Sequence, residues 1–403
     1  MRKSVRALAL VLPLMLVAAA CGDDDETTTT DPAATEATEA GGTEPAATEP
    51  AATEPAATEA ESGGGEGLAA AQAVVDANLT IPADIGPTIP LDSTPEVKTI
   101  AWLECSLPSC IQIGVGFKNA AAALGWNLEV ISFSTDAAAA FQQAIDLGVD
   151  YVAITGTAPA LIQDQLDQAK ELGIPLVSCF DTAEPLPAEN NILMQCGDAS
   201  AVERAGDLIA NAIIADSGGK ANVLMVNIPD FAVLVTERES SKAAYAANCA
   251  DCTFNELALT LDQLLAGEVP GAVLSAVQAD PSIDYIHLAF DGLAGGLTTT
   301  LADADLLEGR KIVGVDYSGP ILQEIVDGTM AFWTTNPKEY SAWLMVDAAA
   351  RHSIGQANTE ERANAILPTF LVNSADVAEP LIASDGWPGP ATMAEQFAAL
   401  WGK

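Results

Sequence analysis

Three aspartates stand directly behind short apolar runs, a spacing that suits the capture of a small polar molecule. The runs Lys-Ile-Val-Gly-Val, Ile-His-Leu-Ala-Phe and Leu-Val-Ser-Cys-Phe end in Asp316, Asp291 and Asp181. Runs of this kind are typical of strands buried on both faces of a parallel sheet, so the acids emerge at the carboxyl ends of the strands. Open α/β sheets bind ligands at that edge, and we therefore expect the three acids at one binding site.

The same acids allow two other interpretations. An aspartate that precedes a helix is a common N-cap, because its carboxylate accepts hydrogen bonds from free backbone amides of the first turn. We favour ligand contact for Asp316, whereas both interpretations stay open for Asp291. Acids aligned on a sheet edge also occur in glycoside hydrolases, an alternative that predicts turnover of a glycoside.

Other catalytic signatures are absent from the sequence. Of its two histidines, His287 lies inside a predicted buried strand and His352 on an amphipathic helix, so neither is a good candidate for a general base. The sequence has no Gly-x-Ser-x-Gly motif, no phosphate-binding loop and no His-Glu-x-x-His motif. We therefore predict that the protein is not an enzyme and uses no cofactor and no metal.

Charge narrows the range of partners. The 403 residues include 16 basic and 56 acidic side chains, and the formal charge of -40 argues against nucleic acid and anionic membrane surfaces as partners. We interpret the acidic excess as a solvated surface rather than an acidic binding face. A chain of this length exceeds one ordinary core, so two lobes with appendages are expected.

The amino terminus predicts export and a tether. Arg2, Lys3 and Arg6 precede an apolar run that is too short to span a bilayer but suits a secretory signal. The run ends in Val-Ala-Ala-Ala-Cys-Gly, which resembles a bacterial lipobox that would make Cys21 the lipidated first residue and anchor the chain to the cell membrane. We predict residues 1–21 to be the lipoprotein signal peptide with the lipidated Cys, and a plain signal peptide with an incidental Cys is the alternative. Residues 22–67, with repeated Thr-Glu-Pro-Ala-Ala, predict a disordered linker.

From Lys98 onward, strand-like and helix-like segments alternate with short joins, which predicts right-handed βαβ units and parallel sheets. Strands are predicted at residues 99–103, 127–132, 151–155, 176–178, 192–195, 222–227, 254–259, 285–289, 312–315, 331–334 and 370–372. Helices are predicted at residues 68–79, 111–124, 136–147, 158–172, 338–355 and 392–401. The strands form two series of similar length, so we expect two comparable α/β lobes, with an N-terminal arm at 68–97 along the first.

Apart from Cys21 the sequence has six cysteines, an even number that indicates disulfides in an exported protein. We predict three pairs, Cys105 with Cys110, Cys179 with Cys196, and Cys249 with Cys252. Zinc is the competing interpretation of the last pair. A zinc site would need a second ligand pair at metal spacing, which the sequence lacks. A redox-active Cys-x-x-Cys motif would follow a strand, whereas Cys249 and Cys252 follow a predicted helix.

Four short motifs give the globular part a family resemblance. They are Ala-Leu-Gly-Trp at 123–126, Leu-Gly-Ile-Pro-Leu-Val at 172–177, Val-Gly-Val-Asp at 313–316 and Trp-Thr-Thr-Asn-Pro at 333–337. With these motifs, residues 98–372 resemble the type I periplasmic binding proteins, the ribose-binding and related sugar-binding group. The arm and the loop from Cys105 to Cys110 resemble an actinobacterial lipoprotein branch of that group.

The resemblance implies two Rossmann-like lobes with parallel sheets, joined by a three-segment hinge. The crossovers would fall near Gly197, Asn336 and Leu367. Lobe 1 would then contain residues 98–197 and 337–366, and lobe 2 residues 198–336 and 367–403. Three hinge strands would let the lobes close by rigid-body bending.

In that family a sugar sits between the lobes, bound by carboxylates, amides and an arginine and covered by aromatic rings. The ligand-binding positions that the resemblance and the strand ends imply are Glu104, Ser106, Phe180, Asp181, Phe231, Arg238, Phe290, Asp291, Asp316, Tyr317, Thr335 and Asn336. The first lobe departs from the pattern, because Leu-Pro-Ser-Cys at 107–110 replaces a motif with two stacking aromatics. Phe180, Phe231, Phe290, Tyr317 and Trp333 are the candidates to replace them, with core packing as the alternative for these rings.

The resemblance therefore implies a lipid-anchored, monomeric, extracytoplasmic substrate-binding protein of an ABC importer. It would capture a small polar solute, a sugar or polyol, and its partners would be the permease and ATPase subunits. The alternatives are a ligand-sensing receptor lipoprotein of the same fold and a binder of a non-sugar solute such as an amine or amino acid. The membrane would be contacted through the lipid anchor only.

Overall fold

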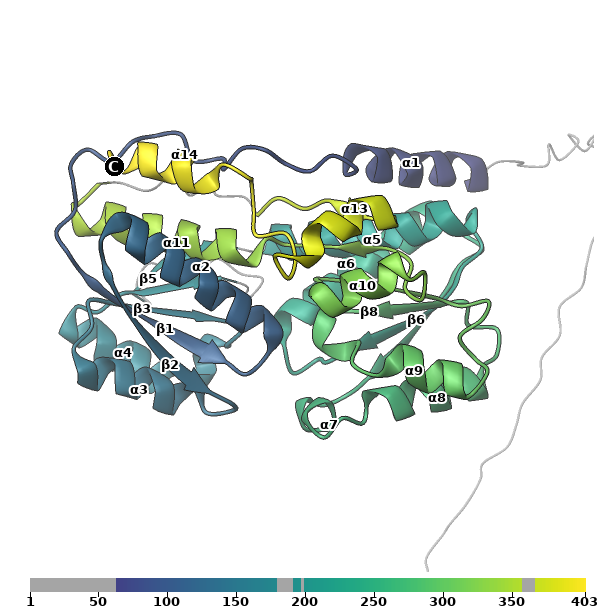
Figure 1. Cartoon of the computed structure of the whole chain (residues 1–403). Helices are drawn as coiled ribbons and strands as arrows, with labels where there is room; N and C mark the ends of the chain where they lie inside the picture. Colours follow the sequence, from purple (N-terminus) through teal and green to yellow (C-terminus); the bar gives the residue numbers. More distant parts are fainter. Residues whose placement is uncertain (1–62, 180–190, 197–198, 357–366) are drawn as a thin grey trace, which may run out of the picture. The chain divides into compact units, whose positions relative to one another are not determined.

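The computed structural model describes residues 63–179, 191–196, 199–356 and 367–403. Two sheets organise these residues into two α/β lobes (Figure 1). The first lobe is built on a five-stranded sheet of order β2-β1-β3-β4-β5, and the second on a six-stranded sheet of order β11-β10-β9-β8-β6-β7. The α/β fold with two sheets agrees with the prediction from the sequence.

The first lobe has parallel strands with helices on both faces (Figure 1). Its strands are β1 (Thr99–Cys105), β2 (Asn127–Phe133), β3 (Tyr151–Thr155), β4 (Leu176–Cys179) and β5 (Ile192–Cys196). Its helices are α2 (Pro108–Leu124), α3 (Ala137–Leu147), η1 (Pro159–Leu161), α4 (Gln163–Leu172), α11 (Lys338–Ser353) and α14 (Met393–Leu400).

Alternation along β1 explains the two layers of this lobe. Ile100 and Trp102 pack into the core formed with α2 and α11, whereas Ala101 and Leu103 pack into the core formed with α3 and α4. Successive side chains of a strand point to opposite faces, so an uninterrupted apolar run predicts a sheet covered on both sides. Asp136 is the N-cap of helix α3, and its carboxylate accepts a hydrogen bond from the Ala139 backbone amide at 2.8 Å.

The second lobe has the same construction with one reversed strand. Its strands are β6 (Asn222–Asn227), β7 (Thr253–Ala258), β8 (Tyr285–Leu288), β9 (Lys311–Val315), β10 (Trp333–Thr334) and β11 (Leu371–Val372). Its helices are α1 (Gly63–Ala77), α5 (Ala199–Ser217), α6 (Ala232–Asn248), α7 (Leu261–Leu265), α8 (Val269–Ala279), η3 (Asp291–Leu293), α9 (Leu297–Asp303), α10 (Gly319–Val326) and α13 (Ala375–Ile382). Strand β11 pairs antiparallel with β10, so this sheet is mixed rather than wholly parallel.

The Val-Gly-Val-Asp motif in β9 has a packing role. A Cβ atom at Gly314 would lie 2.6 Å from the Trp333 ring, so only glycine leaves room for that indole. Trp333 is fully buried in the second-lobe core. The alternative that we gave for this ring, core packing, is therefore the one that the structure supports.

The chain passes between the lobes several times. The passages lie between β5 and α5, between β10 and α11, and between α11 and β11, as their places in the two sheets require. Helix α1 packs against α5 and α6 of the second lobe, and the arm behind it returns to the first lobe, where Leu91 donates a backbone hydrogen bond to Leu400 at 2.8 Å.

The tail differs from the prediction that residues 367–403 belong to the second lobe. Helix α14 packs against α2 and α11 of the first lobe instead. Trp343 of α11 stacks on Phe397 and Trp401, with ring centroids 5.4 Å and 5.5 Å away. Phe397 of α14 and its C-cap residue Trp401 stand one helical turn apart, and the indole of Trp401 donates to the buried Asp347 carboxylate at 2.8 Å. Burial of these rings fixes the helix on the first lobe.

Two of the three predicted disulfides are present among the described residues. Cys105 bonds to Cys110, and Cys249 bonds to Cys252. Cys179 is also disulfide-bonded, and the parallel register places it opposite Cys196, whose side chain lies outside the described residues. Within the part of the chain that the structure describes, no helix is long and apolar enough to cross a bilayer. The predicted lipidation site Cys21 lies outside that part.

Candidate functional site: a cavity between the lobes

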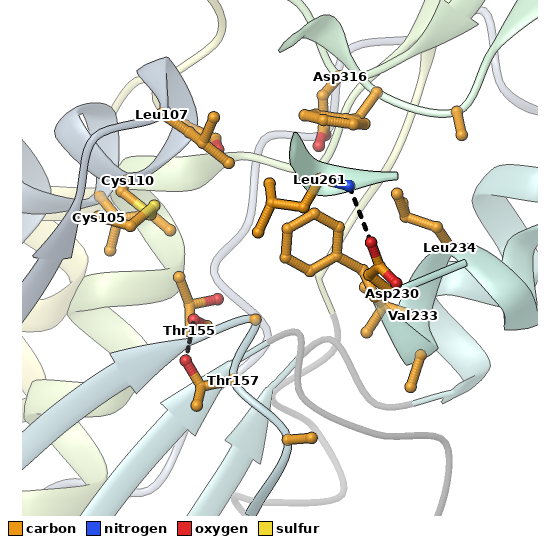
Figure 2. A pocket seen from close by; sticks show the side chains of 18 of the residues that line it. Cys105, Leu107, Cys110, Thr155, Thr157, Asp230, Val233, Leu234, Leu261 and Asp316 are labelled. Atoms are coloured by element: carbon orange, nitrogen blue, oxygen red, sulfur yellow. Dashed lines mark hydrogen bonds between the residues drawn. A yellow bond between two sulfur atoms is a disulfide. The ribbon is translucent and has the colours of Figure 1, made fainter. Parts of the chain in front are cut away.

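A cavity of about 290 Å³ lies between the two lobes. The first lobe lines it with the ends of β1, β2 and β3 and the loops that follow them, and the second lobe with the segments that follow β6, β8 and β9 (Figure 2). Two hinge residues, Asn336 and Lys338, complete the lining. The carboxyl ends of parallel strands from both sheets therefore meet at the cavity, as expected for a ligand site in open α/β sheets.

The first lobe supplies the hydroxyl groups of the lining. These are Ser106, Ser109, Ser134, Thr135, Thr155 and Thr157. The Thr155 hydroxyl donates to the Cys179 carbonyl oxygen, and the Thr157 hydroxyl donates to the Thr155 carbonyl oxygen at 3.5 Å (Figure 2). The Cys105–Cys110 disulfide closes the loop between β1 and α2 at the cavity. A hydroxyl group both donates and accepts hydrogen bonds, so this wall suits a polar molecule.

The second lobe presents a different wall. Its apolar lining includes Val202, Phe231, Val233, Leu234, Leu261, Leu265, Phe290 and Val315. The rings of Phe231 and Phe290 meet edge to face, with centroids 6.4 Å apart. The Asp230 carboxylate accepts a hydrogen bond from the Leu261 backbone amide at 2.8 Å and so holds that loop against the cavity (Figure 2). Among the described lining residues, those of this lobe are apolar except for three acids, Asp230, Glu237 and Asp316.

An ion pair joins the lobes at the hinge end of the cavity. The Asp316 carboxylate accepts hydrogen bonds from Lys338 Nζ at 2.7 Å and from the Asn336 backbone amide at 3.4 Å. Lys338 begins α11 of the first lobe, whereas Asp316 follows β9 of the second. Asp316 has φ +60°, a left-handed conformation that aspartate tolerates better than most residues, and this turn ends the strand. The predicted ligand acid therefore already has a cationic partner, although a carboxylate has further lone pairs for a ligand.

Two buried acids, Glu237 and Asp291, interact with the charges of this pair, and the buried His287 lies next to Glu237. Burial, together with the charge of Asp316, raises the pKa of Asp291 to about 7 and the pKa of Glu237 well above its usual value, and Lys338 opposes both effects. Burial lowers the pKa of His287 to about 3. Glu237 Oε1 lies 3.4 Å from His287 Nε2. The imidazole is therefore neutral at physiological pH, and burial favours the protonated form of both acids.

Five of the predicted binding residues line the cavity. They are Ser106, Phe231, Phe290, Asp316 and Asn336. Phe180 and Asp181, the latter being the third acid of the predicted set, lie outside the described residues.

The other predicted positions have different surroundings. The guanidinium of Arg238 bonds to Glu239 and Glu256, with nitrogen–oxygen distances of 2.7 Å and 3.1 Å, and it does not line the cavity. Asp291 is buried in η3 next to the cavity rather than in its lining, although it does not cap that helix, where Phe290 holds the N-cap position.

Glu104, Tyr317 and Thr335 are likewise not part of the lining. The Glu104 carboxylate packs against Gly114 in α2, and Tyr317 belongs to the second-lobe core. The buried Thr335 hydroxyl donates to the Asn336 carbonyl oxygen at 3.3 Å.

The prediction from the sequence missed most of the lining, including the charged residues Asp230, Glu237 and Lys338. Glu237 immediately precedes Arg238 on α6, so the residue that we predicted on this helix is one position beyond the residue that lines the cavity. Lys338 directly follows the Thr-Thr-Asn-Pro motif, and that motif is the signal that could have marked it as a hinge residue.

The comparisons with known proteins place the chain in a family. The model for the periplasmic binding protein domain matches residues 108–357. The chain belongs to the periplasmic binding protein family. Members of this family bind solutes and are not enzymes, which confirms the prediction that the protein is not an enzyme. No curated protein matches the chain.

Solved structures agree with this family fold. An ABC transporter solute-binding protein from Mycobacterium smegmatis with bound glycerol matches with a TM-score of 0.60 at 19% identity, covering 71% of this chain and 97% of that one. A 5-methylthioribose transporter solute-binding protein from Thermotoga lettingae, in complex with 5-methylthioribose, matches with a TM-score of 0.62 at 18% identity, covering 78% of this chain and 99% of that one. A carbohydrate transporter from Acidothermus cellulolyticus, in complex with myo-inositol, matches with 0.58 at 20%, covering 72% and 98%. At these identities the likeness shows the fold alone.

Proposed function

We propose that this protein is the substrate-binding lipoprotein of an ABC importer and captures a sugar-like or polyol-like solute in the cavity between its lobes. The observation that carries the proposal is that strand ends of two separately packed sheets, and two hinge residues, line one cavity. A molecule held there contacts both lobes at once, so its binding energy favours the arrangement that brings them together.

The residues proposed to contact the solute are Ser106, Phe231, Phe290, Asp316 and Asn336, which line the cavity. Hydrogen bonds that involve a charged group contribute about 1.5–3 kcal/mol each, so a few of them can fix the orientation of a small polyol. Solved relatives with this fold carry glycerol, 5-methylthioribose or myo-inositol, which supports the class of solute. The signal-like segment and Cys21 support an extracytoplasmic place with a lipid anchor.

A thermal-shift screen tests the proposal. The exported chain is heated with sugars, polyols, amino acids and amines, and a solute at a hundred times its dissociation constant should add about 2.7 kcal/mol of stability. The compound should be recovered chemically unchanged, because a hydrolase acting on a glycoside would release products. A panel in which no compound raises the melting temperature would refute the proposed binding function.

A blocking variant locates the bound solute. Ala232 is exposed and lines the cavity, so Ala232→Trp adds bulk to the cavity without disturbing the core. We expect calorimetry to show a loss of binding. Ala246 is exposed on the same helix and does not line the cavity, so Ala246→Trp is the matched control and should bind normally. Equal affinity for both variants would exclude this cavity.

A further inference from the structure

Glu237 stands apart from the other acids of the cavity. Asp230 accepts a hydrogen bond from the Leu261 backbone amide, and Asp316 is paired with Lys338. Glu237 also lines the cavity and is only 2% exposed, yet its Oε1 atom has no hydrogen-bond partner among the described residues. A buried acceptor without a partner is uncommon in folded proteins and asks for an explanation.

The packing of α6 against α5 fixes the position of Glu237. A Cβ atom at Gly206 would lie 2.5 Å from the Glu237 carbonyl oxygen and 3.1 Å from its Cγ, so the two helices touch at this point. The Ser241 hydroxyl donates to the Gly206 carbonyl oxygen at 2.9 Å and closes the same contact. The side chain of Glu237 is therefore held in place rather than free to turn toward solvent.

The groups that face Glu237 leave it as the available acceptor. His287 of β8 is neutral because of its burial, and its Nε2 approaches Oε1 at 3.4 Å without a hydrogen bond. Burial, together with the charge of Asp316, raises the pKa of Glu237 well above its usual value, and Lys338 opposes this shift. A carboxyl group accepts a hydrogen bond in either protonation state, and a cationic partner favours its ionised form.

The wall next to Glu237 is apolar. Phe231, Leu234 and Phe290 line the cavity on the second lobe, and among the described lining residues that lobe offers no hydroxyl side chain. A bare sugar carries hydroxyl groups around its whole edge. Those that faced this wall would lose water without gaining a partner, which disfavours binding.

We infer that the solute is amphipathic: Glu237 accepts a hydrogen bond from a hydroxyl or ammonium group of the solute, and an apolar substituent of the solute packs on Phe231, Leu234 and Phe290. This inference rests on the proposed function, since it concerns the same cavity. It names Glu237 as a specificity-determining residue and a substituted polyol or amine as the class of solute.

Matched pairs of probes test the apolar part. D-ribose is compared with 5-methylthioribose, and ethanolamine with phenethylamine, by calorimetry on the full exported chain. We expect the compound with the apolar substituent to bind about tenfold tighter or more within at least one pair. If ribose or myo-inositol binds at least as tightly as the best substituted probe, the inference fails and the proposed function stands. If no probe and no polyol binds, both fail.

Variants of Glu237 test the polar part and separate the two sources of the donor group. Glu237→Gln keeps an acceptor oxygen, so a hydroxyl-bearing probe should retain its affinity within about threefold. A bound ammonium group favours the ionised carboxylate, which glutamine cannot supply, so an ammonium probe should lose about tenfold or more. Glu237→Met removes the acceptor and should weaken either probe by about tenfold or more.

Glu239→Gln is the control, because Glu239 is exposed on the same helix and pairs with Arg238 outside the cavity. The melting temperature of each variant without solute establishes that it is folded. Unchanged affinity in a folded Glu237→Met protein would overturn the assignment of Glu237.

Discussion

Replacing Asp291 by asparagine should make the protein more stable at neutral and alkaline pH. Asp291 is 6% exposed, and its burial next to Asp316 raises its pKa to about 7 from a usual value of 3.8. Between these two pH values the folded protein holds a proton at Asp291 that the unfolded chain has released. The free energy of unfolding therefore falls as the pH rises from about 3.8 to about 7, and the loss is complete above that range.

The size of the effect follows from the same two values. A difference of about three pKa units, at 1.36 kcal/mol per unit, corresponds to a loss on the order of 4 kcal/mol above pH 7. Asparagine has nearly the same shape and does not ionise. The difference in unfolding free energy between Asp291→Asn and the parent protein should therefore grow with pH and level off above about pH 7.

Urea unfolding of both proteins at several values between pH 5 and pH 8 measures this difference. His287 titrates in the opposite sense, since its pKa is lowered to about 3, but it is present in both proteins and cancels in the comparison. Asp303→Asn, on the exposed face of α9, is the control for replacing an aspartate that is not buried, and it should not reproduce the gain in stability of Asp291→Asn. A parallel pH dependence for Asp291→Asn and the parent protein would refute the idea that this carboxyl group is desolvated in the fold.

Two further predictions concern the hinge and the packing of helices. Lys338→Met should lower the unfolding free energy by about 3 kcal/mol because it leaves the Asp316 carboxylate without its cationic partner. The double variant Lys338→Met with Asp316→Asn should lose less, since it removes the carboxylate as well. Equal losses for the single and the double variant in denaturant unfolding would count against the ion pair. Gly116→Ala should lower the unfolding free energy by about 2 kcal/mol, since the new Cβ would lie 2.7 Å from the Glu339 Cα atom of α11. Gly271→Ala in α8, where the new Cβ would meet open space, should raise the unfolding free energy by about 0.5–1 kcal/mol. A stabilised Gly116→Ala protein would contradict the close contact of α2 with α11.

The strands were the most predictable part of the fold. Buried parallel strands appear in the sequence as short apolar runs with an abrupt polar end, and the run before Asp316 became β9. The packing of the tail was not predictable in the same way. The spacing of Phe397 and Trp401 shows that α14 has an apolar face, but the spacing does not say which lobe that face covers. That depends on Trp343, more than fifty residues earlier in the chain.

The binding site was predictable only in part, for a related reason. On a helix, a shift of one residue turns a side chain by about 100°, so choosing Arg238 instead of Glu237 moved the prediction from the cavity to the outer surface. The partner of Asp316 was missed because a lysine behind an Asn-Pro motif looks like a solvated charge. Only the folded chain brings Lys338 next to a carboxylate that lies 22 positions earlier.

A crystal structure of the chain with the most stabilising solute of the thermal-shift panel tests the central claim most directly. The account predicts one solute molecule in the cavity, in contact with hydroxyl groups of the first lobe and with Phe231 or Phe290 of the second. A solute bound on one lobe alone, or at any place away from these residues, would contradict it.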